Sequence, residues 1–158
     1  MKLADGARYY YTEKKNNCAV SILMAGSDKY GLGLTMEDSK LLIGFGGGMG
    51  CGSVCGALSG AIAVLGKLYA DRGDLRRICA GFAKAFKAVY ECDSWDCSVL
   101  AAKYKNKETR CEPVVVIAAE LLEQYRYASL KRAEDDVRVE IEFDGNEYFD
   151  GISLIDIE

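Results

Sequence analysis

The spacing of apolar positions predicts that most of this chain is helical. Between residues 75 and 90, apolar side chains recur every three or four positions and form one stripe, as on a helix that packs a single face against a core: Leu75, Ile78, Cys79, Phe82, Phe86 and Val89. Similar patterns predict further helices over residues 7–15, 18–29, 35–43, 53–69, 97–104 and 109–125. We therefore expect a mainly α fold, a compact multi-helix domain over residues 1–133.

The pattern changes near the C-terminus. Residues 137–144 alternate apolar and charged side chains, Asp144-Gly145 is a hairpin-type turn, and residues 148–157 form a second candidate strand. The segment 134–158 carries ten acidic residues and one basic residue, a net charge of −9, which leaves +5 on the rest of a chain whose total is −4. We expect an acidic β-hairpin extension with a solvated edge. It would pack on the basic helical body or pair with a second copy in a homodimer.

The composition limits which catalytic and metal sites are possible, because the chain has seven cysteines and no histidine. Cys–His and Ser–His catalytic pairs, histidine metal ligands and a haem attached through Cys-x-x-Cys-His are therefore excluded. The N-terminus resembles no secretion signal, and the longest weakly polar run, residues 53–66, is too short to span a membrane. We expect a cytoplasmic protein, where seven thiols would not form a static disulfide framework. The sequence has no basic cluster interleaved with aromatic residues, so we expect no nucleic-acid binding.

Four cysteines share a position in the predicted helices. Cys18, Cys55, Cys97 and Cys111 each fall in a first turn, where unpaired N–H groups and the helix dipole favour an anion and lower a thiol pKa. They are the candidate catalytic residues and the candidate metal ligands. The alternative is that they are small buried hydrophobes, which fits Cys79 best. Cys51 and Cys92 are candidate resolving thiols, and no Cys-x-x-Cys pair exists.

A glycine-rich segment, residues 44–50, precedes the helix that contains Cys55. It matches neither the dinucleotide-binding nor the P-loop motif and follows no predicted strand, so we expect no nucleotide. Its backbone N–H groups could approach an anion or a sulfur cluster, which makes Gly46, Gly47, Gly48 and Cys51 candidate cofactor-binding residues. The alternative is a flexible connector. The spacing of Gly52, Gly56 and Gly60 predicts a backbone packed closely on one helix face.

These residues resemble a known family. Residues 44–50 followed by Val54-Cys55-Gly56-Ala57-Leu58-Ser59-Gly60-Ala61, with an early Asn17-Cys18-Ala19 and the later Cys97 and Cys111, are similar to the C-GCAxxG-C-C family of redox-active proteins. The resemblance covers about residues 8–125 and implies a compact helical fold and redox chemistry on an undefined substrate. The family is similar to the helical part of split-Soret cytochromes, which carry haem and an iron–sulfur cluster. The lack of histidine excludes haem of that type, so only a cluster site could carry over.

Three hypotheses follow from this sequence. In the first, the thiolates of Cys18, Cys55, Cys97 and Cys111 bind an iron–sulfur cluster. In the second, the same thiols, or pairs such as Cys51/Cys55 and Cys92/Cys97, cycle between dithiol and disulfide with a redox partner that the sequence does not name. In the third, the chain is a structural or partner-binding helical domain whose cysteines form part of the core or bind zinc.

Overall fold

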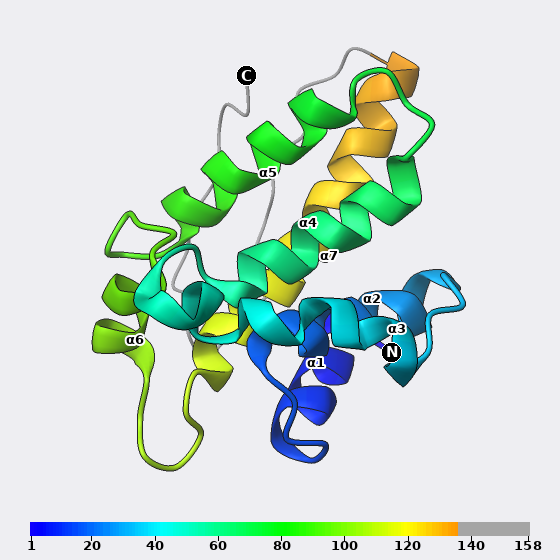
Figure 1. Cartoon of the computed structure of the whole chain (residues 1–158). Coiled ribbons are helices and arrows are strands. Elements are labelled where there is room, and N and C mark those ends of the chain that lie inside the picture. Colours follow the sequence, from blue (N-terminus) through cyan, green and yellow to red (C-terminus); the bar gives the residue numbers. More distant parts are fainter. Residues whose placement is uncertain (136–158) are drawn as a thin grey trace.

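The computed structural model describes the backbone of residues 1–135 and the side chains of residues 1–127, and over this range the chain is helical (Figure 1). The α-helices are α1 (Leu3–Thr12), α2 (Cys18–Tyr30), α3 (Met36–Ser39), α4 (Gly56–Tyr69), α5 (Leu75–Val89), α6 (Cys97–Tyr104) and α7 (Glu112–Asp135). A 3-10 helix, η1 (Lys40–Phe45), and a wide turn, η2 (Gly48–Gly52), connect α3 to α4. The expected mainly α fold is confirmed for these residues.

Helix α7 forms the centre of the core. Between Val114 and Leu122 every side chain but that of Glu120 is buried, so the helix is apolar on nearly all sides and belongs in the interior. Helices α1, α2, α4, α5 and α6 all contact it. The buried hydroxyl of Tyr90 donates to the carbonyl of Val114 at 2.8 Å, which satisfies the polar end of a fully buried ring.

Helix boundaries follow the sequence signals where those signals are local. Helix α2 begins at Cys18 as predicted, because the side chain of Asn17 caps it by accepting from the backbone N–H of Val20. Helix α4 was predicted to begin at residue 53, and this is wrong. Val54 forms an antiparallel bridge with Asp96, which requires extended backbone, so the helix begins only at Gly56 with Cys55 as its N-cap.

Helices α2 and α4 pack as closely as the glycine spacing predicted. A Cβ atom at Gly60 would lie 2.5 Å from the backbone oxygen of Ala19, so only glycine fits there. Gly56 faces α2 in the same way, whereas Gly52 lies before α4 with a φ of 74° and does not belong to this contact. The close approach brings the N-terminal ends of the two helices together.

The last described residues of the chain belong to helix α7. Helix α7 continues through Asp135, past the expected domain boundary after residue 133. The predicted β-hairpin over residues 134–158 otherwise lies outside the described residues. Within residues 1–135 the chain forms two isolated bridges, Val54–Asp96 and Asn106–Arg110, and no strand. In this same range, no helix combines the length and the apolar character needed to span a bilayer.

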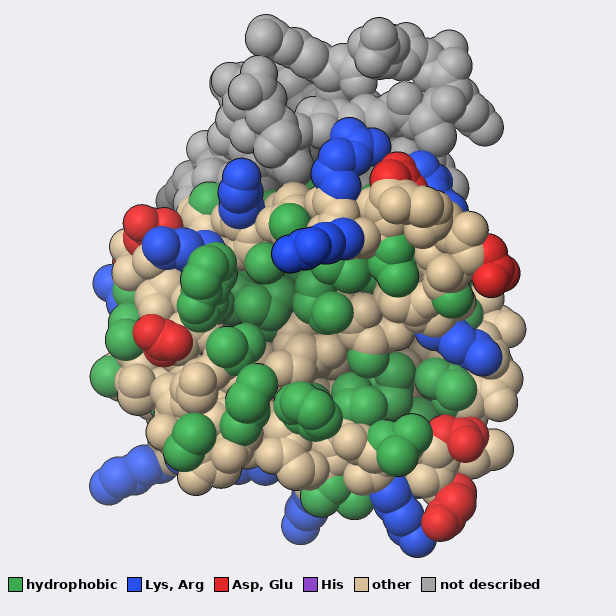
Figure 2. Space-filling view, turned by 45° about the horizontal axis from the view of Figure 1, so that its top comes forward, with side chains coloured by type: hydrophobic (Ala, Val, Ile, Leu, Met, Phe, Trp, Pro, Cys, Tyr) green, Lys and Arg blue, Asp and Glu red, His purple; other side chains and the backbone are tan. Residues whose placement is uncertain are grey.

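Hydrophobic side chains gather on one face of the molecule (Figure 2). Leu41 and Ile43 of η1 are exposed to 79% and 57%. Beside them, η1 and α4 enclose an apolar groove lined by Leu42, Phe45, Val54, Leu58, Ser59, Ile62 and Ala63. None of the residues that line this groove lines the cysteine pocket described below.

Candidate functional site

Four helix starts meet around one pocket, and each contributes a cysteine. Cys18 is the first residue of α2, Cys55 is the N-cap of α4, Cys97 is the first residue of α6, and Cys111 directly precedes α7. All four line a cavity of about 220 Å³. Because the N-terminal end of a helix carries partial positive charge, four such ends make this cavity favourable for an anion or a thiolate.

The side chain of Asn17 holds Cys18 against the glycine-rich segment. Its Oδ1 atom accepts from the backbone N–H of Val20, while its Nδ2 atom donates to the carbonyl oxygen of Ile43 at 2.9 Å. A Cβ atom at Gly46 would lie 2.6 Å from that Nδ2 atom, so glycine is required for the close approach. This contact brings the backbone N–H of Gly47 within hydrogen-bonding reach of the Cys18 sulfur.

Backbone hydrogen bonds connect the two segments that carry Cys55 and Cys97. The N–H of Cys55 donates to the carbonyl of Trp95 at 2.8 Å, and the N–H of Cys97 donates to the carbonyl of Ser53 at 2.6 Å. These are the two bonds of the Val54–Asp96 bridge. The bridge therefore fixes the starts of α4 and α6 on the same side of the pocket.

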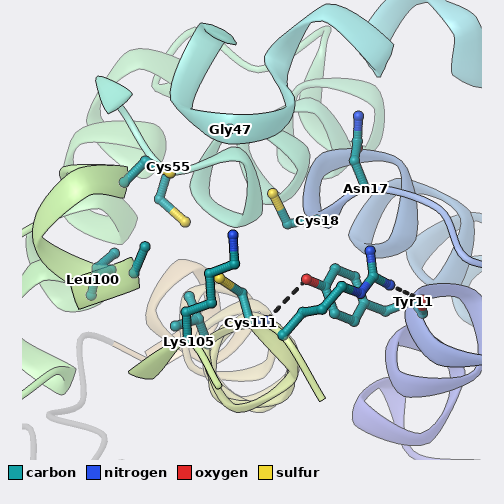
Figure 3. A pocket seen from close by; sticks show the side chains of 12 residues that line it. Tyr11, Asn17, Cys18, Gly47, Cys55, Leu100, Lys105 and Cys111 are labelled. Carbon is teal, nitrogen blue, oxygen red and sulfur yellow. Dashed lines mark hydrogen bonds between the residues drawn. The ribbon is translucent and has the colours of Figure 1, made fainter. Parts of the chain in front are cut away.

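Helix α1 positions Cys111 through Tyr11. The Tyr11 hydroxyl accepts from the backbone N–H of Cys111 at 3.0 Å, and the Arg110 guanidinium donates to the carbonyl of Tyr11 at 2.7 Å (Figure 3). The guanidinium also lies 4.1 Å from the centre of the Tyr11 ring. Together these contacts fix the start of α7 against α1, although the residues lie far apart in sequence.

Cys18 and Cys55 interact as a pair of thiols whose pKa values shift in opposite directions. The Cys55 thiol donates to the sulfur of Cys18, which lowers the pKa of Cys18 to about 7, and burial only partly opposes this effect. The backbone N–H groups of Gly47, Ala19 and Cys18 itself lower that pKa further. The pKa of Cys55 rises well above its ordinary value, because it keeps its proton in the bond to Cys18 and is also buried. Cys18 is thus the thiolate of the pair near neutral pH, and Cys55 the thiol.

The expectation of a lowered pKa is wrong for the other pocket cysteines. Burial raises the pKa of both Cys97 and Cys111, and the negative charge of the Cys18 thiolate raises each further. Lys105 opposes the rise at both thiols by a smaller amount. At a partly buried helix start, loss of hydration can outweigh the dipole, because desolvation penalises the charged form directly.

The glycine-rich segment contributes to the pocket at one position only. Gly47 lines the cavity, whereas Gly46 packs against Asn17. Gly48 is needed for packing as well, since a Cβ atom there would lie 2.5 Å from the Cβ atom of Cys97. Cys51 is exposed, and its Sγ atom lies 3.5 Å from the carbonyl oxygen of Gly48. Gly46, Gly48 and Cys51 are therefore outside the lining of the pocket, and Gly46 and Gly48 shape the segment that covers it.

Two basic residues at the pocket were not among the predicted site residues. Lys105 and Arg110 both line the cavity, both side chains are exposed, and none of the described residues that line it is acidic. Figure 3 shows the amine of Lys105 directed into the space where the side chains of Cys18, Cys55 and Cys111 converge. In the sequence, these cations belong to a charged loop in which nothing distinguishes them from Lys103 or Lys107.

The remaining cysteines lie away from this cavity. Cys79 and Cys92 are partly buried and pack against the hydrophobic core, and burial raises the pKa of Cys79. Neither is among the residues that line the pocket. The placement of Cys79 agrees with its interpretation as a packing residue. The suggested pairs Cys51/Cys55 and Cys92/Cys97 each join one pocket cysteine to one outside it.

The thiols as placed do not fit a single metal ion. Within the described part of the chain, no three side chains of histidine, cysteine, aspartate or glutamate form a group that could hold one. The four pocket cysteines share a cavity, and among them Cys55 has the largest effect on the pKa of Cys18. Their arrangement favours chemistry on a thiol pair.

Comparison with protein families agrees with the cysteine arrangement. Residues 16–125 match the model of the family described as "Putative redox-active protein (C_GCAxxG_C_C)". The chain belongs to the C-GCAxxG-C-C family. The matched region contains all four pocket cysteines, the glycine-rich segment and both basic residues of the pocket. No curated protein and no solved structure matched the chain.

Proposed function

We propose that this member of the C-GCAxxG-C-C family catalyses thiol–disulfide exchange, with Cys18 as the nucleophile and Cys55 as the resolving thiol. One observation carries the proposal: Cys18 and Cys55 both line the pocket where four helix starts meet, and the interaction with Cys55 lowers the pKa of Cys18. A thiolate with a pKa near ambient pH is the most effective attacking group in disulfide exchange. Cys18 has that property, and the pKa values of the other three pocket thiols are raised.

The exchange proceeds in two balanced steps. The Cys18 thiolate attacks one sulfur of a substrate disulfide, the substrate S–S bond breaks, and one half leaves as a thiolate that solvent protonates. Cys55 then loses its proton to solvent and attacks the Cys18 sulfur, which expels the second half as a thiolate. The substrate disulfide is reduced to two thiols, and the protein dithiol is oxidised to the Cys18–Cys55 disulfide. A reducing thiol partner returns the protein to its starting state.

Cys97 and Cys111 accompany the reacting pair in the same cavity. Their raised pKa values keep them protonated near neutral pH, so they do not compete with Cys18 for the first attack. They are available as a second pair that accepts the disulfide from Cys18–Cys55 by exchange. The seven free thiols suit a reducing compartment such as the cytoplasm.

The test is to treat the fully reduced protein with a small disulfide and map the products by mass spectrometry. We expect a Cys18–Cys55 disulfide as the first intramolecular product, and a trapped mixed disulfide on Cys18 when Cys55 is replaced by serine. Cys79→Ser is the matched control, since Cys79 is also partly buried but lies outside the pocket. Equal labelling of all cysteines, or a first adduct on any residue other than Cys18, would overturn the proposal.

The second candidate is a cluster-binding electron-transfer protein. Its support is that four cysteines from four separate helix starts face one cavity with two cations and no described acid. Cys18, Cys55, Cys97 and Cys111 would be its ligands, and a bound iron–sulfur cluster would supply one-electron chemistry. Among the described residues, no three potential ligands are grouped so as to hold a metal ion, which ranks this candidate second. If protein purified without oxygen contains iron and acid-labile sulfide, and Cys111→Ser loses them, the cluster protein becomes the first candidate. Iron-free protein would remove this candidate.

A further inference from the structure

The pocket combines exposed positively charged residues with cysteines that are less accessible. Cys55 is only 5% exposed and Cys18 is partly buried, whereas Lys105 and Arg110 are exposed and line the same cavity. A molecule whose sulfur reaches Cys18 must therefore place its remaining atoms next to these cations. The charge of those atoms affects how well it binds.

A short loop holds the two cations beside the same cavity. Asn106 and Arg110 form an antiparallel bridge with two backbone hydrogen bonds of 3.0 Å each. The Asn106 side chain accepts from the backbone N–H of Thr109 at 2.7 Å, which closes the loop between them. Lys105 directly precedes this bridge and Arg110 ends it, so the geometry of the loop brings both side chains to the pocket.

The two cations differ in the contacts that they already make within the protein. The Arg110 guanidinium is held by the ring and the carbonyl oxygen of Tyr11. Lys105 has no carboxylate partner among the side chains of residues 1–127, and Figure 3 shows its amine directed into the cavity. An ammonium group in that position can pair with a negatively charged ligand, and the neighbouring helix starts add to the positive electrostatic potential of the cavity.

We propose that Lys105 makes this pocket selective for small disulfides that carry carboxylates close to the sulfur atoms. The proposal rests on the exchange chemistry of Cys18 and deepens it by naming the class of substrate. The cavity of about 220 Å³ is smaller than the ~300–1,000 Å³ typical of pockets for drug-sized ligands, which favours a small molecule. One carboxylate pairs with the ammonium of Lys105 while the adjacent sulfur meets Cys18.

The carboxylate changes the position of the substrate and not the balance of the reaction. The Cys18 thiolate still breaks the substrate S–S bond and releases one half as a thiolate, which solvent protonates. The ion pair with Lys105 holds the other half while Cys55 attacks, so the mixed disulfide resolves inside the pocket. A substrate with ammonium groups meets Lys105 and Arg110 as like charges and is excluded.

The test uses three symmetric disulfides of similar size that differ in charge. These are 2,2′-dithiodiacetate, which is anionic, bis(2-hydroxyethyl) disulfide, which is neutral, and cystamine, which is cationic. The rate of Cys18 mixed-disulfide formation is measured in the reduced protein at pH 7.5 and low ionic strength. Each rate is divided by the rate of the same disulfide with a small neutral thiol, which removes differences in intrinsic reactivity.

We expect the normalised rates to fall in the order anionic, neutral, cationic, with about a tenfold difference between the first and the last. Lys105→Gln should reduce the preference for the anion, and added salt should do the same. Lys107→Gln is the matched control, because Lys107 lies in the same loop and is exposed but does not line the pocket. It should leave the order unchanged.

Two failures can be told apart. If Cys18 does not react faster than the cysteines outside the pocket, even with the neutral disulfide, the exchange function itself is wrong. If Cys18 reacts well but the three normalised rates are equal, or Lys105→Gln changes all three by the same factor, the exchange function stands and the charge selectivity is wrong. A uniform change would mean that Lys105 acts only on the thiolate and not on the substrate.

Discussion

Gly56 and the sulfur of Cys18 lie so close that no side chain fits between them. A Cβ atom at residue 56 would lie 2.5 Å from Cys18 Sγ and 2.9 Å from the backbone oxygen of Phe45. The start of α4 thus forms one wall around the proposed nucleophile, and the absence of a side chain at residue 56 is what allows Cys18 to point toward Cys55.

We expect Gly56→Ala to displace Cys18 and slow its reaction with a disulfide by about tenfold or more, because small shifts at reacting atoms are costly. The matched variant is Gly60→Ala, which meets the backbone of Ala19 on the same face of α2 but does not touch the thiol. Both should lower the free energy of unfolding by about 1–3 kcal/mol. Urea unfolding and the rate of Cys18 alkylation measure the two effects, and equal alkylation rates in the two variants would contradict this role for Gly56.

The reactivity of Cys18 should follow its lowered pKa. Only the thiolate reacts, so its alkylation rate should rise with pH and reach half its maximum at about pH 7, while a free thiol titrates near 9. Cys55→Ala removes the hydrogen-bond donor and should shift the midpoint upward. Cys55→Ser keeps a donor and should shift it less. A midpoint that is the same in the wild type and in Cys55→Ala would show that Cys55 does not stabilise the thiolate.

Asn17 should connect the thiolate to the glycine-rich segment. Asn17→Ser keeps a capping oxygen for α2 but loses the donor to the carbonyl of Ile43. We expect faster amide hydrogen exchange over residues 43–50 in this variant, with α2 itself preserved. Asn17→Ala also loses the cap, so it should cost about 1 kcal/mol more in the free energy of unfolding. Unchanged exchange in Asn17→Ser would mean that the segment is held by other contacts.

Tyr11→Phe should destabilise the start of α7. The substitution keeps the buried ring but removes the hydroxyl that accepts from the backbone N–H of Cys111. An N–H left without a partner in a partly buried position costs about 1–3 kcal/mol, measurable by urea unfolding. Tyr10→Phe is the control, because the hydroxyl of Tyr10 bonds Asp28 in an exposed position and its loss should cost less than about 0.5 kcal/mol. Similar losses in both variants would argue against a specific role for the Tyr11 hydroxyl.

The features that the sequence predicted well are the local ones. The cap at Asn17 and the start of α6 at Cys97 depend on a few neighbouring residues, so their patterns placed both helix starts correctly. The start of α4 depends on the bridge between Val54 and Asp96, and no local pattern announces a pairing over that separation.

The candidate site shows the same division. A sequence can place a cysteine at each of four helix starts, but only the tertiary structure shows that these starts meet at one pocket. Burial and side-chain interactions are also tertiary properties. The predicted fall in pKa holds for Cys18, where the interactions with Cys55 and with backbone N–H groups outweigh burial, and it fails for Cys55, Cys97 and Cys111. Lys105 was not predicted because its role depends on the direction of its side chain relative to those thiols.

The bridge between the starts of α4 and α6 has a consequence for how the family can vary. Both of its hydrogen bonds join main-chain atoms, from Cys55 N–H to Trp95 oxygen and from Cys97 N–H to Ser53 oxygen. Every amino acid supplies a carbonyl oxygen, so the side chains at residues 53 and 95 can be exchanged over evolutionary time without breaking the bridge. Relatives can therefore differ at residues 53 and 95 and still keep the starts of α4 and α6 joined.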